Sequence, residues 1–211
     1  MSIPSPHLFS DGAYNPTTHP YGWASVVDPH GQDILALCQA ASNPPEWMTN
    51  TDWRTHCGWQ EEKLGPYAKE EESKRMVVHV FFPDVDQQQN NGAELIALIL
   101  ALWWALQHEE VKEIRCDSQI VLHSWSKTPP TVVTKTAKDR FRALCTSLRA
   151  KWEAQGGKIV KITGDENRAD LGFHKPSSSS SKATKRKHPL AFVMPPPSWK
   201  KKVEMVADPK D

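Results

Sequence analysis

The sequence predicts a mixed α/β domain in which a five-stranded sheet is flanked by helices. β-prone runs follow one another closely in the first 40 residues, and two helical runs then alternate with short strands. A chain of 211 residues has room for one domain of about 150 residues, which buries enough surface to fold alone. The predicted element order is β-β-β-α-β-α-β-α. A helix that joins two strands as a crossover makes those strands parallel.

The first strands are expected at residues 7–14, 21–28 and 33–40, joined as a hairpin meander because the runs lie so close together. Residues 41–75 break this pattern and are interpreted as an insertion with little regular periodicity. Residues 76–82 (MVVHVFF) are β-prone and are expected to rejoin the sheet. The insertion carries three tryptophans that we expect to pack it onto the body, with stacking on bases as the alternative: Trp47, Trp53 and Trp59.

The second half of the chain alternates helices and strands. Asn90 and Asn91 can cap a largely buried helix, and a later run repeats apolar residues at steps of three and four. The predicted elements are a helix at 93–106, a strand at 112–117, a helix at 135–153, a strand at 158–163 and a short helix at 166–174.

Four acids lie at the ends of these elements: Asp11, Glu94, Asp117 and Asp170. In the predicted order the first strand neighbours strand 112–117, so Asp11 and Asp117 can converge, and packing of the long helix brings Glu94 toward them. Gathered carboxylates repel one another unless a cation compensates their charge, and Mg²⁺ prefers hard oxygen ligands. Considered alone, Glu94 is better explained as a residue that caps a helix, and Asp170 as a residue on a solvated helix face.

Five short motifs resemble the type 1 ribonuclease H family, in a retroelement-like or viral-like version. They are Phe9-Ser10-Asp11-Gly12-Ala13, Gly22-Trp23-Ala24, Asn90-Asn91-Gly92-Ala93-Glu94-Leu95, Asp117-Ser118-Gln119-Ile120-Val121 and Asn167-Arg168-Ala169-Asp170-Leu171. The resemblance covers residues 7–174, with 41–75 outside it. It implies the ribonuclease H-like fold and an endonuclease that hydrolyses the RNA strand of RNA–DNA hybrids with two Mg²⁺ or Mn²⁺ ions.

The resemblance also implies roles for individual residues. Asp11, Glu94, Asp117 and Asp170 match the catalytic metal ligands. In the family, certain side chains contact the 2′-hydroxyl in the minor groove, and their counterparts here are Asn15, Asn90, Asn91 and Gln119. The three asparagines also suit turns or helix caps. The family's basic element grips the DNA-strand backbone, and its counterparts here are Thr134, Lys135, Lys138, Arg140 and Arg142. A merely solvated helix face is the alternative for these basic residues.

One family feature is missing. The glycine- and histidine-rich loop before the last helix is absent, because residues 160–165 run almost directly into Glu166. His174, four residues after Asp170, is a possible substitute, although an ordinary terminal histidine is the simpler reading. The loss predicts an altered rate or metal preference. Two alternatives stay open: a non-catalytic nucleic-acid-binding or structural protein on this scaffold, and a nuclease for structured DNA.

Composition points to an intracellular protein. The division expected is a ribonuclease H-like domain at 1–174 and a flexible tail rich in Ser, Pro and Lys at 175–211. The tail holds nine Lys/Arg and three acids, so the rest of the chain is acidic although the net charge of the whole chain is +1. It predicts affinity for nucleic acid and import into the nucleus, with cytoplasm or virion as alternatives. No signal peptide or membrane span is expected. The four dispersed cysteines predict free thiols: Cys38, Cys57, Cys116 and Cys145.

Overall fold

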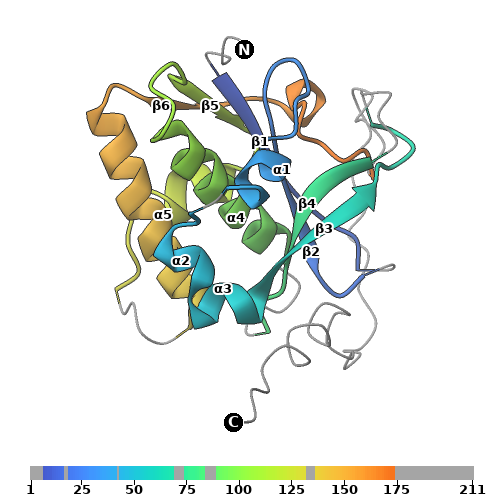
Figure 1. The fold of residues 1–211 in the computed structure, drawn as a ribbon, viewed down its shortest axis with the longest axis horizontal. Coiled ribbons are helices and arrows are strands. Elements are labelled where there is room, and N and C mark those ends of the chain that lie inside the picture. The colour runs from blue at the N-terminus through green and yellow to red at the C-terminus, as the bar shows by residue number, and fades with distance from the viewer. Residues whose placement is uncertain are drawn as a thin grey trace. The chain divides into compact units, whose positions relative to one another are not determined.

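The computed structural model describes residues 7–16, 19–41, 43–68, 74–83, 89–131 and 136–173. Within these ranges six strands form one sheet in the order β3-β4-β2-β1-β5-β6 (Figure 1). β1 is antiparallel to β2 and parallel to β5, and β5 is parallel to β6. The strand bounds are β1 (His7–Tyr14), β2 (Gly22–Val27), β3 (Cys57–Lys63), β4 (Lys74–Val80), β5 (Glu113–Cys116) and β6 (Lys158–Lys161).

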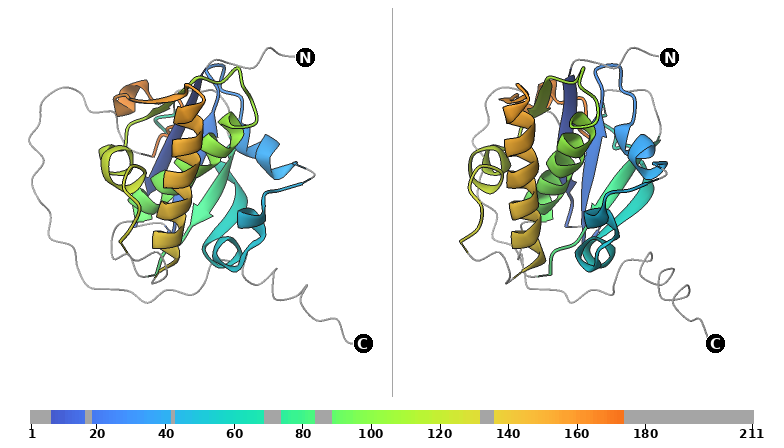
Figure 2. Two further views of the ribbon diagram at one scale, coloured as in Figure 1. Left: turned by 90° about the vertical axis from the view of Figure 1, so that its left-hand side faces the viewer. Right: turned by 60° about the vertical axis from the view of Figure 1, so that its left-hand side comes forward.

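Helices complete a mixed α/β architecture, so the predicted ribonuclease H-like fold class is confirmed, although the sheet has six strands where five were predicted. Two long helices lie on one side of the sheet, with α4 between the sheet and α5 (Figure 2). Two short helical turns, one of π type and one of 3-10 type, follow β5 and β6. The bounds are α1 (Ile34–Gln39), α2 (Glu46–Thr49), α3 (Thr51–His56), α4 (Gln89–Ala105), η1 (Val121–Trp125), α5 (Ala137–Ala154) and η2 (Gly164–Glu166).

Helix α4 forms the centre of the core because it is apolar on every side. Almost all of its residues from Gly92 to Leu102 are fully buried, packed between strands β1 and β2 and helix α5. It can approach β1 closely only because residue 12 is glycine. A Cβ on Gly12 would lie 2.1 Å from the backbone nitrogen of Glu94. This contact fixes Glu94 beside strand β1.

The third predicted strand is wrong: residues 34–39 form helix α1, and only an isolated bridge between Val27 and Asp33 extends the sheet there. The Asp33 carboxylate accepts hydrogen bonds from the backbone N–H groups of Leu35 and Ala36 and so caps the helix. Its other oxygen accepts the N–H of Met76, at 2.6 Å. The capping acid decides the conformation of a segment whose composition also suits a strand.

The insertion at 41–75 is more regular than predicted. It contains α2, α3 and β3, and β3 adds an edge strand to the sheet by pairing with β4. Trp53 is buried, and its ring lies 5.5 Å from that of Trp47, 5.8 Å from that of Trp59 and 6.5 Å from that of Phe141 on α5. The expected packing of these tryptophans onto the body is confirmed.

The expected last helix at 166–174 is absent from the described residues of that range, 166–173. The 3-10 turn η2 ends at Glu166, and residues 167–173 follow as turns and bends. Asn167 turns its side chain into the protein, and Gly172 has a φ of 73°, which an α-helix does not allow. Asp170 therefore lies on an irregular segment.

Two further expectations can be compared with the described residues. All four cysteines are free, as predicted, and all four are buried. No helix in the described part of the chain is long and apolar enough to cross a membrane. The basic tail at 175–211 lies outside the described residues.

Candidate metal centre

Sheet topology brings two of the predicted acids to one place. β1 and β5 are parallel neighbours, and Ser10 pairs with Cys116. The residue after each of these two is an aspartate, on β1 and directly after β5, so Asp11 and Asp117 lie side by side. Glu94, in the second turn of α4, lies against β1 through the close contact at Gly12. Asp11 and Glu94 are only 6% and 4% exposed, which removes them from the bulk water that normally screens such charges.

Asn167 holds the two aspartates in place. Its amide Nδ2 donates hydrogen bonds to the Asp11 carboxylate at 3.3 Å and to the Asp117 carboxylate at 3.2 Å, and it also reaches the backbone oxygen of Ser10 at 3.0 Å. Its Oδ1 accepts the N–H of Ala169, at 3.1 Å. The side chain is fully buried. Sequence reasoning assigned Asn167 no role, although the residue stands in the motif that contains Asp170.

Burial and mutual repulsion dominate the electrostatics of the centre. Burial, followed by the charges of Asp117 and Asp170, raises the pKa of Asp11 well above its ordinary value. Burial, followed by the charges of Asp11 and Asp117, likewise raises the pKa of Glu94. The Glu94 Oε2 atom is buried and has no hydrogen-bond partner among the described residues. A cation would satisfy this oxygen and remove the repulsion, so the donor set fits a metal ion.

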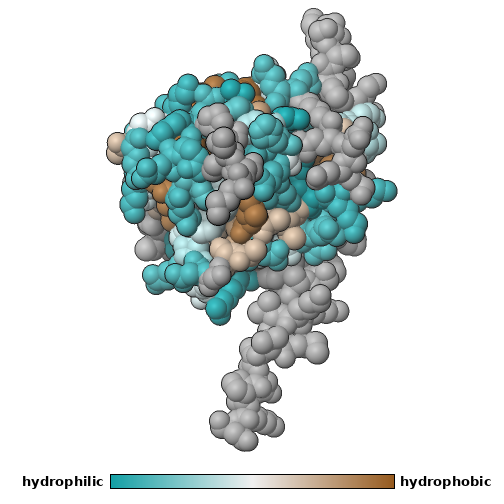
Figure 3. All heavy atoms as spheres, turned by 45° about the horizontal axis from the view of Figure 1, so that its top comes forward, coloured by the Kyte–Doolittle hydropathy of each residue, from teal (hydrophilic) through white to brown (hydrophobic). Residues whose placement is uncertain are grey.

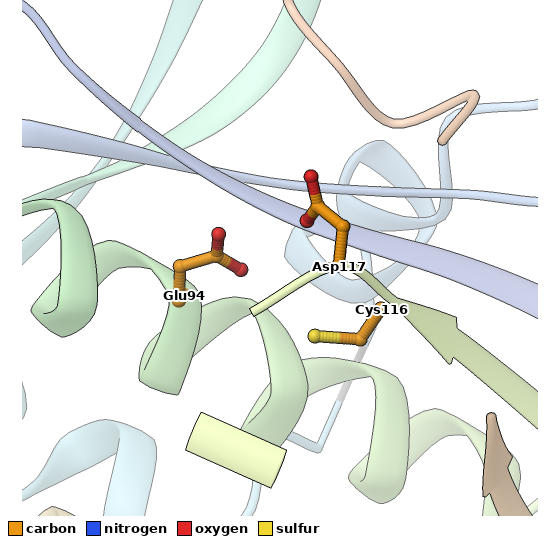
Figure 4. Close-up of side chains that lie close together, drawn as sticks. All are labelled: Glu94, Cys116 and Asp117. Atoms are coloured by element: carbon orange, nitrogen blue, oxygen red, sulfur yellow. The ribbon is translucent and has the colours of Figure 1, made fainter. Parts of the chain in front are cut away.

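Among the residues that the structure describes, Glu94, Cys116 and Asp117 form a tight cluster of groups able to hold a metal. One ligand atom from each lies within 4.8 Å of the others, and the Glu94 and Asp117 carboxylates lie close together with the Cys116 thiol beside them (Figure 4). Burial, then the charge of Glu94, raises the pKa of the Cys116 thiol well above its ordinary value. A neutral thiol is a poor ligand for a hard cation, so the two carboxylates are the donors that suit Mg²⁺.

Asp170 approaches the centre from its irregular segment. Its charge contributes to the raised pKa of Asp11, although it is not part of the tight cluster. One of its oxygens, Oδ1, accepts the backbone N–H of Gly172 at 2.8 Å. The structure thus brings Asp11, Glu94 and Asp117 together and places Asp170 at the edge of the same acidic centre.

The predicted hybrid-reading residues lie in different settings. Asn15 follows the end of β1, and its backbone oxygen accepts the N–H of His19. Asn90 and Asn91 lie inside the first turn of α4, so they do not cap it, and this expectation is wrong. Asn90 and Gln119 are exposed. The face drawn in Figure 3 is mostly hydrophilic where it is coloured, with small hydrophobic patches, which suits a polar ligand better than an apolar one.

The predicted basic residues divide into two groups. Arg140 pairs with Asp52 through two hydrogen bonds, which joins α5 to α3 of the insertion. Lys138 and Arg142 lie near the ring of Trp125, with their charged groups 5.8 Å and 5.7 Å from its centre. Arg142 also forms an ion pair with Asp139, at 3.4 Å. Thr134, Lys135 and the alternative proton-transfer candidate His174 lie outside the described residues.

The fold and the centre together define an α/β protein of the ribonuclease H-like fold, in which the carboxylates of Asp11, Glu94 and Asp117 converge beside the end of β5. Among solved structures, the chain is similar to ribonuclease H1 from the halophilic archaeon Halobacterium salinarum, with 18% sequence identity and a TM-score of 0.37. The alignment covers 78% of this chain and 89% of that one. No protein-family model and no curated protein match the sequence. A similarity of this degree does not assign an activity to this chain, and the acidic centre is the feature that bears on its function.

Proposed function

We propose that this protein is a metal-dependent endonuclease that hydrolyses the RNA strand of RNA–DNA hybrids. The observation that carries the proposal is the convergence of the Asp11, Glu94 and Asp117 carboxylates, two of which have strongly raised pKa values. An acidic centre of this kind is destabilising without a cation. A protein that keeps it has a chemical use for it, and the hybrid as substrate is taken from the sequence resemblance.

Asp11, Glu94, Asp117 and Asp170 are the proposed ligands of two Mg²⁺ or Mn²⁺ ions. Such a pair of ions, when bound, supplies an activated water and stabilises the leaving oxygen in phosphodiester hydrolysis. The chain's own contribution is to orient the donors. Asn167 fixes Asp11 and Asp117 by hydrogen bonds. The contact between Gly12 and α4 fixes Glu94. Orientation by such supporting groups governs how well a metal is held.

The proposed substrate contacts follow the resemblance. Asn15, Asn90, Asn91 and Gln119 would read the minor groove, where the 2′-hydroxyl distinguishes RNA from DNA. Lys138 and Arg142, whose charges lie beside Trp125, would contact the backbone of the DNA strand, and Thr134 and Lys135 are proposed contacts of the same backbone. The basic tail would add affinity for nucleic acid and direct the protein to the nucleus.

The test is cleavage of a labelled RNA–DNA hybrid in Mg²⁺ and in Mn²⁺, compared with matched single-stranded and duplex DNA. We expect hybrid-specific cutting by the wild type and its loss in Asp117→Asn. Glu110→Gln is the matched control, because Glu110 loses a charge while its partner is His108, away from the acidic cluster. It should cut like the wild type.

Two other results would redirect the assignment. Tight hybrid binding without cutting in either metal would favour a nucleic-acid-binding protein. Cutting of structured DNA in preference to the hybrid would keep the metal centre and change the substrate.

A further inference from the structure

Asp170 lies on a segment that needs support from outside. This segment, residues 167 to 173, forms turns and bends where a last helix was expected. Within it the Asp170 Oδ1 accepts the N–H of Gly172 at 2.8 Å, but turns and bends have fewer internal hydrogen bonds than a helix, so the place of the segment depends on what packs around it. The contacts of this segment therefore decide where the Asp170 carboxylate points.

Arg75 holds the segment immediately before Asp170. The side chain extends from β4 and is 3% exposed. Its Nη1 donates to the backbone oxygen of Ala169 at 3.0 Å and to that of Arg168 at 3.3 Å. The same nitrogen lies 3.3 Å from the hydroxyl oxygen of Ser25, which is the cross-strand partner of Asp11 on β2. One guanidinium thus connects the sheet beside Asp11 to the two residues that precede Asp170.

The insertion also holds the segment immediately after Asp170. The backbone N–H of Gly65 donates to the oxygen of Leu171 at 2.7 Å, and the N–H of Tyr67 donates to the oxygen of Gly172 at 3.0 Å. Leu171 is 1% exposed, in a small apolar cluster on the sheet. Asp170 is therefore bracketed on both sides by residues from the 41–75 region, which lies outside the family resemblance.

We propose that Arg75 is a positioning residue that fixes Asp170 toward the acidic centre, an assignment that rests on the proposed function. The insertion then serves as the support that a terminal helix would otherwise give. A guanidinium suits the task, because its rigid plane holds Nη1, with its two N–H donors, at a fixed position among two carbonyl oxygens and a hydroxyl. A lysine has one flexible ammonium and cannot reproduce that geometry.

The test compares Arg75→Met and Arg75→Lys with the control Arg149→Met. Arg149 is matched to Arg75: it is 6% exposed, and its Nη1 donates to the backbone oxygen of Leu122 at 2.8 Å and to the hydroxyl of Ser126 at 2.6 Å. Its loss should destabilise the protein without touching the Asp170 segment. Two quantities are measured: amide hydrogen exchange at 169–173 in metal-free protein, and Mn²⁺ affinity by calorimetry.

Arg75→Met should speed exchange at 169–173 about tenfold, because the carbonyls lose buried hydrogen bonds. It should weaken Mn²⁺ binding about 10- to 100-fold, the range found when a group that orients a metal ligand is removed. Arg75→Lys should fall between the wild type and Arg75→Met. Arg149→Met should leave both quantities unchanged, even though it unfolds at a lower denaturant concentration.

A double mutant separates positioning from general damage. If Arg75 acts through Asp170, Arg75→Met should weaken Mn²⁺ binding no further in an Asp170→Asn background. Additive losses, or unchanged exchange at 169–173 in a protein that does bind Mn²⁺, would overturn the role of Arg75 alone. A wild type that neither binds Mn²⁺ nor cuts the hybrid would overturn the proposed function itself.

Discussion

At the residue scale, the acidic centre depends on one neutral side chain. Asn167 donates from a single nitrogen toward Asp11 and Asp117, and so separates two carboxylates without adding charge. Asn167→Asp would replace the shared donor with a third anion in a fully buried position. We expect it to lower the free energy of unfolding by about 2–4 kcal/mol in metal-free protein at neutral pH.

Urea denaturation with and without Mn²⁺ measures this effect. Bound cation should recover part of the loss, since it offsets the added charge. Gln107→Glu, which adds a carboxylate at an exposed position of the short segment after α4, is the control and should change stability by less than about 0.5 kcal/mol. Equal losses in the two variants would show that the position of the charge is unimportant.

The raised pKa values of Asp11 and Glu94 predict how stability depends on pH. Because the folded protein favours the protonated carboxyls, their contribution is fully present below the unfolded values of about 4 and is lost as pH rises through the higher folded values. Metal-free Glu94→Gln should therefore lose less stability than the wild type between pH 4 and pH 8. Calorimetric Tm values across this range measure the difference, and parallel curves for the two proteins would contradict it.

At the element scale, local signals could be read from the sequence and distant contacts could not. The runs that hold or precede Asp11 and Asp117 are β-prone, and the apolar pattern of α4 is continuous, so local patterns predict that Asp11, Glu94 and Asp117 lie near one another. β3 is mostly polar, and only its pairing with β4 makes it a strand. Arg75 and the segment that it contacts beside Asp170 are more than ninety residues apart in the sequence, and no local sequence pattern predicts that contact.

One side chain, that of Asp33, favours helix α1 over the strand that was predicted for the same residues. The Asp33 carboxylate caps α1 and also accepts the N–H of Met76 on β4, so it joins helix and sheet. Asp33→Ala should reduce the free energy of unfolding by about 2 kcal/mol, the sum of a lost cap and a lost charged hydrogen bond. Glu46→Ala, at an exposed first-turn acid of α2, should have little effect. Chemical denaturation of both variants measures their free energies of unfolding. Equal losses in the two variants would contradict the capping role of Asp33.

At the scale of the whole molecule, the insertion is part of the domain. Trp53 packs against Phe141 of α5, and Asp52 pairs with Arg140 of the same helix. On the other side, residues 65 and 67 bond to the segment around Asp170. The same insertion therefore connects the basic helix and the acidic centre, which explains physically why its described residues include regular helices and a strand although its sequence shows little periodicity.

This connection predicts unequal roles for the basic residues of α5 in binding nucleic acid. Arg140 is paired with Asp52 and Arg142 with Asp139, whereas Lys138 presents its ammonium group beside Trp125. Lys138→Met should weaken hybrid binding and reduce the slope of log affinity against log salt by about 1, as expected when one phosphate contact is lost. Arg140→Met and Arg142→Met should change that slope less, because an acid already balances each of their charges.

Hybrid affinity measured between 50 and 200 mM salt, on the order of the range in which such slopes are determined, distinguishes the three variants. The Asp52–Arg140 pair is partly exposed, so its loss should lower the free energy of unfolding by only about 0–1 kcal/mol. A difference in salt slope therefore does not result from unfolding. The same salt slope in all three variants would mean that α5 presents a uniform charged surface. A steeper loss for Arg140→Met would mean that hybrid binding breaks the Asp52 pair and moves the insertion.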